Sequence, residues 1–408
     1  MVHDNDAKDK LAGKSLPVGR YSLGKLGRFH KGSGISKSEL ADTGIPCLRY
    51  AEIYTTYGNT IYELRSRVSA EIASKAFAIE HGDIIFAGSG ETQEDIGKAT
   101  AYLGEGKAVV GSDTVILRGH GQDPSFLAHA LSTDDAIRQK GCLGKGQSIV
   151  HIHAPDLSKI EVWLAPMAEQ RWIAGLLQTW DEAIQKYGKL RAAKQQRLDV
   201  LRSGLLFGSL RLDRKRANWR PRRLSEVTFE LSDRNTDLAL GREMVMGVTN
   251  SRGIVPMREH SVAKDISRYK RLPSRAFAYN PMRINVGSIA MNEGETDVLV
   301  SPDYVAFACK TDGLEPDYLN HLRKTQWWAH YITSGGSGSV RQRTYYDDLA
   351  ALHLPLPGLD EQRRIVNLLN AARSDLDATE RMVASVTRQK RGLMQKLLTG
   401  QWRVSMGA

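Results

Sequence analysis

The stretch from Leu164 to Ile184 reads LAPMAEQRWIAGLLQTWDEAI, and the stretch from Pro355 to Leu376 reads PLPGLDEQRRIVNLLNAARSDL. Both contain a proline, then an acidic residue followed by Gln and Arg, and then apolar residues at helical spacing. Aligning Glu169 with Glu361 gives an offset of 361 − 169 = 192 residues, close to half of the 408-residue chain. A period of this length is too long for a solenoid, so it indicates a duplicated domain.

The segments upstream of these two stretches also match. DPSFLAH at 123–129 aligns with EPDYLNH at 315–321 at the same offset, and VGSDTVIL at 110–117 aligns with VSPDYVAF at 300–307 at an offset of 190. Gly97 aligns with Gly287, also at 190. Short β-type runs such as GDIIFAG, glycine and proline between them, and a short helical segment predict an α+β fold for each half.

The apolar residues of both matching stretches continue as a heptad seam, with alternating steps of four and three. We therefore expect two long helices, the first beginning after Pro166 and ending near Gly208, the second beginning after Pro357 and ending near Gly400. The simplest partner for each helix is the other, in an antiparallel intramolecular coiled coil; the alternative is that each helix packs only on its own half. The seam positions are Ile173, Leu177, Trp180, Ile184, Tyr187, Arg191, Lys194, Leu198, Leu201 and Leu205, and Ile365, Leu369, Ala372, Leu376, Thr379, Val383, Val386, Lys390, Leu393 and Leu397.

An antiparallel pair would relate the two halves by a pseudo-twofold axis. A helix from Ile173 to Leu205 is roughly 50 Å long at about 1.5 Å per residue. DNA half-sites one turn apart are separated by about 34 to 36 Å. Two different readers at this spacing predict a split, asymmetric DNA site.

Composition and charge favour a polyanionic partner. The chain carries a net charge of +11, with a pI near 9.4. From Lys186 to Arg223 there are thirteen Lys or Arg residues against Asp199 and Asp213, an excess of 13 − 2 = 11. The alternative to DNA binding is a solvated helix face followed by a basic linker. The charged start, the lack of a long apolar run and three scattered cysteines predict a cytoplasmic protein with reduced, mostly buried thiols.

The chain resembles the specificity subunit of type I restriction-modification enzymes over nearly its whole length. The residues that carry the resemblance are LPLPGLDEQRRIVNLLNAA and RQKRGLMQKLLTG in the second half, LAPMAEQRWIAGLL and LRSGLLFG in the first, and the domain segments YNPMRINVGSIA and VLVSPDYVAF. The resemblance implies two target-recognition domains separated by conserved helices. It also implies docking of two adenine methyltransferase subunits and, in the nuclease form, restriction subunits. S-adenosylmethionine, ATP and Mg are then expected on the partner subunits, with no cofactor in this chain.

The expected organisation follows from the duplication and the resemblance together. It comprises a flexible N-terminus at 1–15, a target-recognition domain at 16–160, a helical spacer at 161–210, a second target-recognition domain at 211–350 and a second helical spacer at 351–408.

Catalytic motifs are missing from the sequence. NPMR at Asn280 has Met282 and Arg283 where an amino-methyltransferase needs a second proline and an aromatic residue, so we expect a turn or a DNA-facing loop there. His151 and His153 have the spacing of metal ligands on a strand, but no further ligand cluster accompanies them. We therefore expect neither a catalytic site nor a metal site in this chain.

Candidate DNA-facing residues are polar or basic residues in predicted loops, because Arg and Asn pair well with base edges and cations with phosphate. These are Lys31, Lys37, Arg49, Tyr50, Thr92, Asn250, Arg252, Lys270, Arg271 and Arg283. The acidic-Gln-Arg triplets are expected to contact a partner subunit or to cap their helices: Glu169, Gln170 and Arg171, and Glu361, Gln362 and Arg363.

Two other functions compete with a recognition subunit. A stand-alone DNA-binding regulator with two readers would have the same basic, two-headed sequence. A complete methyltransferase would need the catalytic motif that is missing.

Overall fold

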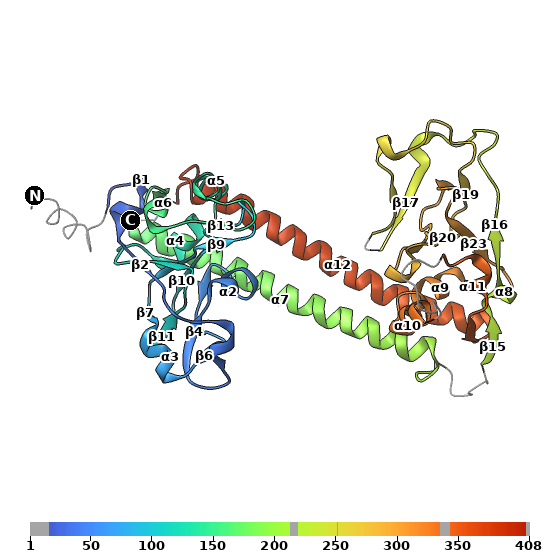
Figure 1. Ribbon diagram of the computed structural model, residues 1–408, viewed down its shortest axis with the longest axis horizontal. Helices are drawn as coiled ribbons and strands as arrows, with labels where there is room; N and C mark the ends of the chain where they lie inside the picture. The colour runs from blue at the N-terminus through green and yellow to red at the C-terminus, as the bar shows by residue number, and fades with distance from the viewer. Residues whose placement is uncertain (1–15, 213–218, 251, 335–342, 405–408) are drawn as a thin grey trace, which may run out of the picture. The chain divides into compact units, whose positions relative to one another are not determined.

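The structure is a computed structural model that describes residues 16–212, 219–250, 252–334 and 343–404. The predicted flexible N-terminus at 1–15 lies outside these residues. The chain forms two compact units: Met1–Tyr187 with Met382–Ala408, and Gly188–Arg381. Each unit therefore combines one globular half of the sequence with a segment of each long helix (Figure 1).

The first unit contains two five-stranded sheets, with the strand orders β2-β12-β8-β10-β5 and β3-β6-β4-β11-β7. Strand β8 (Ile84–Ala87, IIFA) is buried on both faces. Ile84 and Phe86 pack into one apolar cluster, and Ile85 and Ala87 pack into another, as the alternation of side chains along a strand requires. The cluster that contains Ile84 also contains Ile173 from the long helix, so the sheet rests on that helix.

The elements of the first unit are short, apart from the long-helix segments. Its strands are β1 (Gly19–Ser22), β2 (Arg28–Lys31), β3 (Leu40–Ala41), β4 (Ile45–Leu48), β5 (Thr60–Ile61), β6 (Ser66–Val68), β7 (Phe77–Ile79), β8, β9 (Ser89–Gly90), β10 (Ala99–Tyr102), β11 (Ala108–Val110), β12 (Thr114–Arg118), β13 (Val150–His151) and β14 (Glu161–Leu164). Its short helices are α1 (Leu23–Leu26), η1 (Lys37–Glu39), α2 (Tyr50–Thr55), α3 (Ala70–Lys75), α4 (Pro124–Ala130), α5 (Asp134–Leu143) and α6 (Ala154–Leu157).

The second unit repeats this topology with fewer strands. Its sheets have the orders β16-β23-β20-β21 and β18-β17-β22-β19. The strands are β15 (Arg220–Arg223), β16 (Thr228–Leu231), β17 (Val245–Thr249), β18 (Gly253–Pro256), β19 (Lys270–Leu272), β20 (Phe277–Tyr279), β21 (Ile289–Met291), β22 (Val298–Val300), β23 (Val305–Cys309) and β24 (His353–Leu356). The helices are α8 (Leu224–Val227), η2 (Arg242–Met244), η3 (Glu259–Ser261), η4 (Ile284–Val286), α9 (Pro316–Leu322), α10 (Gln326–Ser334) and α11 (Tyr346–Ala350).

Strand pairing confirms the duplication. Strands β4 and β11 pair in parallel, as do β17 and β22, and the next strand is antiparallel in both units. The pair β1–β14, with Gly19 opposite Leu164, has its counterpart in β15–β24, with Arg220 opposite Leu356. The mixed helix-and-sheet fold predicted from the sequence is thus confirmed for each half.

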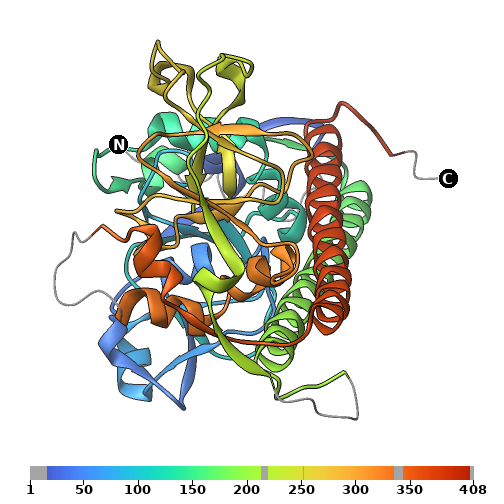
Figure 2. The ribbon, with the colours of Figure 1, turned by 90° about the vertical axis from the view of Figure 1, so that its right-hand side faces the viewer.

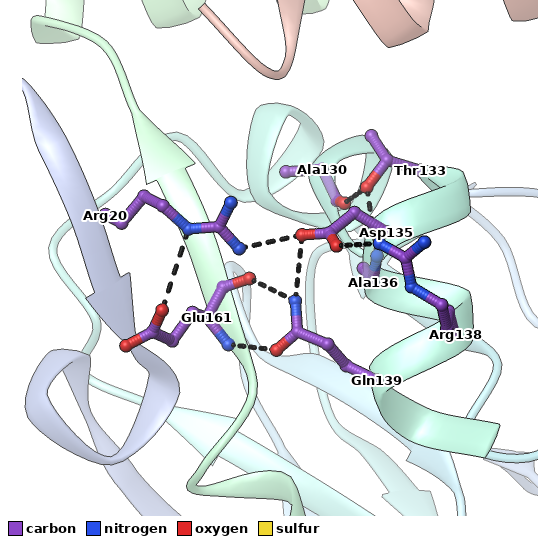
Figure 3. A network of polar contacts seen from close by, with 8 residues as sticks. All are labelled: Arg20, Ala130, Thr133, Asp135, Ala136, Arg138, Gln139 and Glu161. Carbon is purple, nitrogen blue, oxygen red and sulfur yellow. Dashed lines mark hydrogen bonds and ion pairs between the residues drawn. The ribbon is translucent and has the colours of Figure 1, made fainter. Parts of the chain in front are cut away.

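A polar network ties helix α5 of the first unit to the strand pair that leads into the long helix (Figure 3). Arg20 on β1 donates from Nη2 to the Asp135 carboxylate at 2.7 Å, and its Nε lies 3.6 Å from the Glu161 carboxylate on β14. Gln139 accepts a hydrogen bond from the Glu161 backbone N–H at 2.8 Å. These contacts are largely exposed, so they position the strand pair more than they stabilise it.

The two long helices are α7 (Met167–Leu206) and α12 (Leu359–Leu397). Their predicted ends are confirmed: Gly208 and Gly400 follow them with φ of 72° and 74°, the left-handed conformation that terminates many helices. Of the predicted seam residues, only Arg191 is exposed; all the others are buried or half-buried. No helix in the described residues has an apolar run long enough for a bilayer.

Inside each unit, a segment of α7 lies beside a segment of α12 (Figures 1 and 2). In the first unit, Asp181 in α7 forms an ion pair with Lys390 in α12. In the second unit, Lys194 lies 2.7 Å from the Asp375 carboxylate and donates to the Thr379 hydroxyl at 2.9 Å. Polar seam members Lys194, Thr379 and Lys390 therefore contact the neighbouring helix. The predicted pseudo-twofold placement of the two halves stays a prediction.

Candidate nucleic-acid interface

Two equivalent glutamines dock the globular halves onto the first turns of the long helices. In α7, Gln170 accepts a hydrogen bond from the Asp123 backbone N–H at 3.0 Å and donates to the Ala165 carbonyl at 2.7 Å. In α12, Gln362 accepts from the Glu315 backbone N–H at 2.9 Å and donates to the Pro357 carbonyl at 3.0 Å. The glutamine, the residue that donates to it and the residue that accepts from it are each 192 residues apart in the two halves. Both glutamines are about 1% exposed, so they act within the chain.

The glutamates that precede these glutamines are also engaged within the chain. Glu169 forms an ion pair with Arg403, at 2.9 Å from Nη2 to Oε2, and accepts from the Val404 backbone N–H at 3.0 Å. Glu361 forms an ion pair with Arg211 at 3.2 Å and accepts from the Trp219 indole N–H at 3.1 Å. Burial works against the charge of Glu169, but the hydrogen bonds from Arg403 and Val404 hold its pKa below the usual range.

The arginines are the exposed members of the two triplets. Arg171 is exposed on the first turn of α7, next to Trp172, which is 44% exposed. Arg363 is exposed on α12, and its Nη1 lies 3.7 Å from the Asp360 carboxylate. The glutamates and glutamines of the triplets are engaged within the chain, with partners outside the first turns of α7 and α12. The capping alternative stays a prediction. Contact with a partner subunit stays a prediction. Arg171 and Arg363 are the exposed side chains of the triplets, and Arg363 also lies 3.9 Å from the Glu315 carboxylate.

A pair of equivalent histidines connects each globular half to the middle of a long helix. His129 in α4 donates to the Asp181 carboxylate at 2.9 Å. His321 in α9, at the same offset of 192, lies 2.8 Å from the Asn370 side-chain oxygen, and Arg202 donates from Nε to its Nδ1 at 3.3 Å. Burial lowers the pKa of His321 to about 4, so its ring is neutral near pH 7.

The DNA-facing candidates of the first half occupy different settings. Lys31 ends β2, Lys37 begins η1, and both are exposed, as is Thr92 in the connection between β9 and β10. Arg49 and Tyr50 are half-buried at the start of α2, and the Arg49 Nε lies 3.8 Å from the Glu52 carboxylate. Arg49 is thus partly neutralised. The Thr92 hydroxyl donates to the Asp95 carboxylate and accepts from the Asp95 backbone N–H, both at 3.3 Å.

The candidates of the second half separate into two groups. Asn250 and Arg252 are exposed in the turn between β17 and β18, and both line a cleft of about 1160 Å³. Arg283 is exposed immediately before η4. Lys270 and Arg271, on β19, are engaged instead: Lys270 donates to the Tyr304 carbonyl at 2.8 Å, and Arg271 pairs with Asp237. The roles of all these residues in DNA binding stay predictions.

Three basic residues that sequence reasoning missed also line this cleft: Arg323, Lys324 and Arg373. Burial lowers the pKa of Lys324 to about 8, and repulsion from Arg323 acts in the same direction. Burial lowers the pKa of Arg323 to about 10. The run HLRKTQWW at 321–328 contains a signal for them, because basic residues beside aromatic residues are typical of nucleic-acid surfaces.

Comparison with solved structures decides the fold. The S subunit of a type I restriction-modification system from M. genitalium aligns over 94% of this chain and 96% of its own, with a TM-score of 0.58 and 14% identity. A second solved structure, described as showing complex assembly and conformational transition of the type I R-M system, aligns over 95% of this chain and 100% of its own. Its TM-score is 0.54 and its sequence identity is 19%. The chain has the specificity-subunit fold. No family model and no curated protein matches the sequence.

Within this specificity-subunit fold, the residues considered as a catalytic motif and as metal ligands contact neighbouring residues of the same chain. The Asn280 side-chain oxygen accepts from the Met282 backbone N–H at 3.0 Å and so closes a turn. His151 Nδ1 lies 2.9 Å from the Ser89 hydroxyl, and its ring stacks with that of His153 at 6.4 Å. Among the described residues, no three His, Cys, Asp or Glu side chains gather as metal ligands do.

Proposed function

We propose that this chain is the noncatalytic DNA-recognition subunit of a type I restriction-modification complex. It reads a split, asymmetric DNA site and docks adenine methyltransferase subunits and, in the nuclease form, restriction subunits. The complex works in the cytoplasm. The whole-length likeness to specificity subunits supports the proposal, and the net charge of +11 suits a DNA partner.

One observation carries the proposal: the first turns of α7 and α12 are held by the same contacts in both halves of the chain, whereas the exposed loops of the two halves differ. Gln170 and Gln362 make the same hydrogen bonds in both halves. The exposed loops differ: Thr92 lies in a loop with Glu91 and Glu94, whereas Arg283 lies in a loop with Met282 and Asn285. Two copies of one docking arrangement suit two copies of one partner, while two different readers suit two different half-sites.

In this proposal, residues 16–160 and 211–350 are the target-recognition domains, and 161–210 and 351–408 are the helical spacers. Methyltransferase subunits dock near the first turns of α7 and α12, where Arg171 and Arg363 are exposed. Exposed Trp172 adds an apolar surface beside Arg171, and Arg and Trp are enriched where proteins bind tightly.

The experiment that tests the proposal expresses the chain with its methyltransferase subunit in cells and sequences the methylated DNA. We expect a motif of two different half-sequences separated by a fixed spacer. The purified chain with methyl donor, ATP and magnesium should neither methylate nor cut DNA. Turnover by the purified chain alone would contradict the proposal, and tight binding to one continuous sequence without any partner would favour a stand-alone regulator.

A further inference from the structure

One loop stands at the same place in both units. In the first unit it connects β8 to β10, which pair with Phe86 opposite Ala99. In the second unit it connects β20 to β21, which pair with Tyr279 opposite Ile289. Each loop ends in a glycine with positive φ, 67° at Gly97 and 86° at Gly287, two residues before the next strand.

The base of the first loop is held closed by Tyr54 from α2. The Tyr54 hydroxyl lies 3.1 Å from the Ser89 carbonyl and 3.2 Å from the Asp95 carbonyl, so it joins the two ends of the loop. A Cβ at Gly90 would lie 2.9 Å from this hydroxyl, and glycine there allows the close approach. Residues 91–95 beyond this closure are all exposed.

The second loop is held by backbone and serine contacts. The Asn280 N–H donates to the Ser288 carbonyl at 3.1 Å, and the Ser288 hydroxyl donates to the Val248 carbonyl at 2.9 Å. Beyond this closure, Met282 and Val286 are 50% and 58% exposed. These two apolar side chains do not pack into a core of the described chain. They are therefore available to contact a partner surface.

The turn between β17 and β18 adds a further side chain to the second loop. A Cβ at Gly287 would lie 2.5 Å from the Asn250 side-chain oxygen, so the amide of Asn250 lies directly over this glycine. Asn250, Asn285 and Gly287 line one cleft together with Lys324 and Arg373. A nucleic-acid strand in this cleft would meet amides able to pair with base edges and cations able to pair with phosphate.

We infer that residues 90–96 and residues 280–286 with Asn250 determine the two half-sequences of the target, and that Tyr54 and Gly287 position them. This inference rests on the proposed function. The two loops share their place and their closing glycine but differ in chemistry at the tip. The first offers carboxylates and the Gln93 amide, which suit the amino groups of cytosine and adenine. The second offers Arg283, Asn285 and apolar side chains, which suit guanine, adenine and the thymine methyl group.

The test selects a library of randomised duplexes for binding to the complex of the chain with its methyltransferase subunits. Replacing Thr92 and Gln93 together by alanine should change the preference at one or two positions of one half-sequence by about tenfold. N285A should do the same in the other half-sequence, and neither should change the spacer. Glu105→Ala, an exposed residue in the separate turn between β10 and β11, is the matched control and should leave both half-sequences intact.

Tyr54→Phe tests positioning, because it keeps the ring and removes only the hydroxyl. It should broaden the half-sequence that the Thr92 and Gln93 variant alters, with the other half-sequence and the unfolding temperature unchanged. Unchanged base preferences in both loop variants would overturn the inference. Changes by both variants in the same half-sequence would overturn it as well. A folded, assembled loop variant that binds no library member would overturn it too, since the loop would then supply affinity and not sequence preference. Failure of the proposed function looks different: the wild-type complex would select no two-part sequence.

Discussion

Glu169, in the first turn of α7, binds Arg403, which lies just beyond the end of α12, although 234 residues separate them. Glu361, in the first turn of α12, forms an ion pair with Arg211, just beyond the end of α7, at 3.2 Å. Both members of the second pair correspond to the first at the offset of 192. Inside each unit, the start of one long helix is thus fastened to the segment that follows the other. Each unit therefore has its own ion pair that joins the start of one long helix to the end of the other.

Replacing Glu169 by glutamine should lower the free energy of unfolding by about 1 kcal/mol. The variant keeps the size of the side chain but loses the charge that Arg403 contacts. The expected loss of stability is small because Arg403 is 48% exposed, so solvent screens the ion pair. Chemical denaturation of the wild type and the variant measures the difference. E361Q is the matched variant in the second unit and should act in the same direction. Equal stability of E169Q and the wild type would show that the closure contributes nothing.

The same glutamate should make the protein sensitive to acid. Its folded pKa lies below the value of 4.5 expected for the unfolded chain, because the hydrogen bonds from Arg403 and Val404 outweigh the effect of burial. A lowered folded pKa stabilises the fold above pH 4.5, and this contribution is lost as pH falls through the folded pKa. Unfolding measured from roughly pH 3 to 6 should therefore show a shallower loss of stability in E169Q than in the wild type. Parallel curves would contradict this assignment.

Gln362→Ala should destabilise the second unit more than a surface change does. The side chain bonds the Glu315 N–H and the carbonyls of Gly313 and Pro357, so its removal leaves buried backbone groups without partners. We expect a loss of about 2 to 4 kcal/mol. Asn367→Ala, an exposed polar residue on the same helix, is the control. Similar small effects of both changes would mean that the glutamine does not hold the half in place.

DNA binding by the complex should weaken steeply as salt rises. The stretch from Lys186 to Arg223 carries much of the positive charge, although residues 213–218, including Arg214, Lys215 and Arg216, lie outside the described residues. Replacing exposed Lys189, Arg191 and Arg197 by glutamine should reduce the slope of log affinity against log salt by up to about 3, if each meets a phosphate. Lys159→Gln is the control, because Asp156 already neutralises Lys159 at 3.5 Å. An unchanged slope would place this part of α7 away from DNA.

The duplication, the mixed fold of each half and both long helices could be predicted from the sequence, because they depend on local patterns. Heptad spacing, Pro166 and Pro357 before the helices, and Gly208 and Gly400 after them all act over a few residues. The closures by Arg403 and Arg211 were missed, even though these arginines match at the offset of 192. Nothing in the periodicity of a helix says which residue its first turn contacts in three dimensions.

The candidate DNA interface was predicted less completely. Asn250 and Arg252 were predicted because Asn and Arg in a loop suggest base contacts, and both line the cleft, although their contact with DNA stays a prediction. Lys270 and Arg271 look equally suitable in sequence, but the Tyr304 carbonyl and the Asp237 carboxylate engage them. Lys324 was missed because its place in the cleft depends on how α9 and α10 pack, which a single sequence does not display. Tyr54 was missed for the same reason, since its hydroxyl acts on a loop more than thirty residues away.

The most direct test of the two-reader account exchanges residues 16–160 for the matching domain of a chain with a different target. DNA from cells that express the exchanged chain with its methyltransferase subunit is then sequenced for methylation. We expect one half of the methylated motif to change, while the other half and the spacer stay the same. A change in both halves, or methylation of a single uninterrupted sequence, would contradict it.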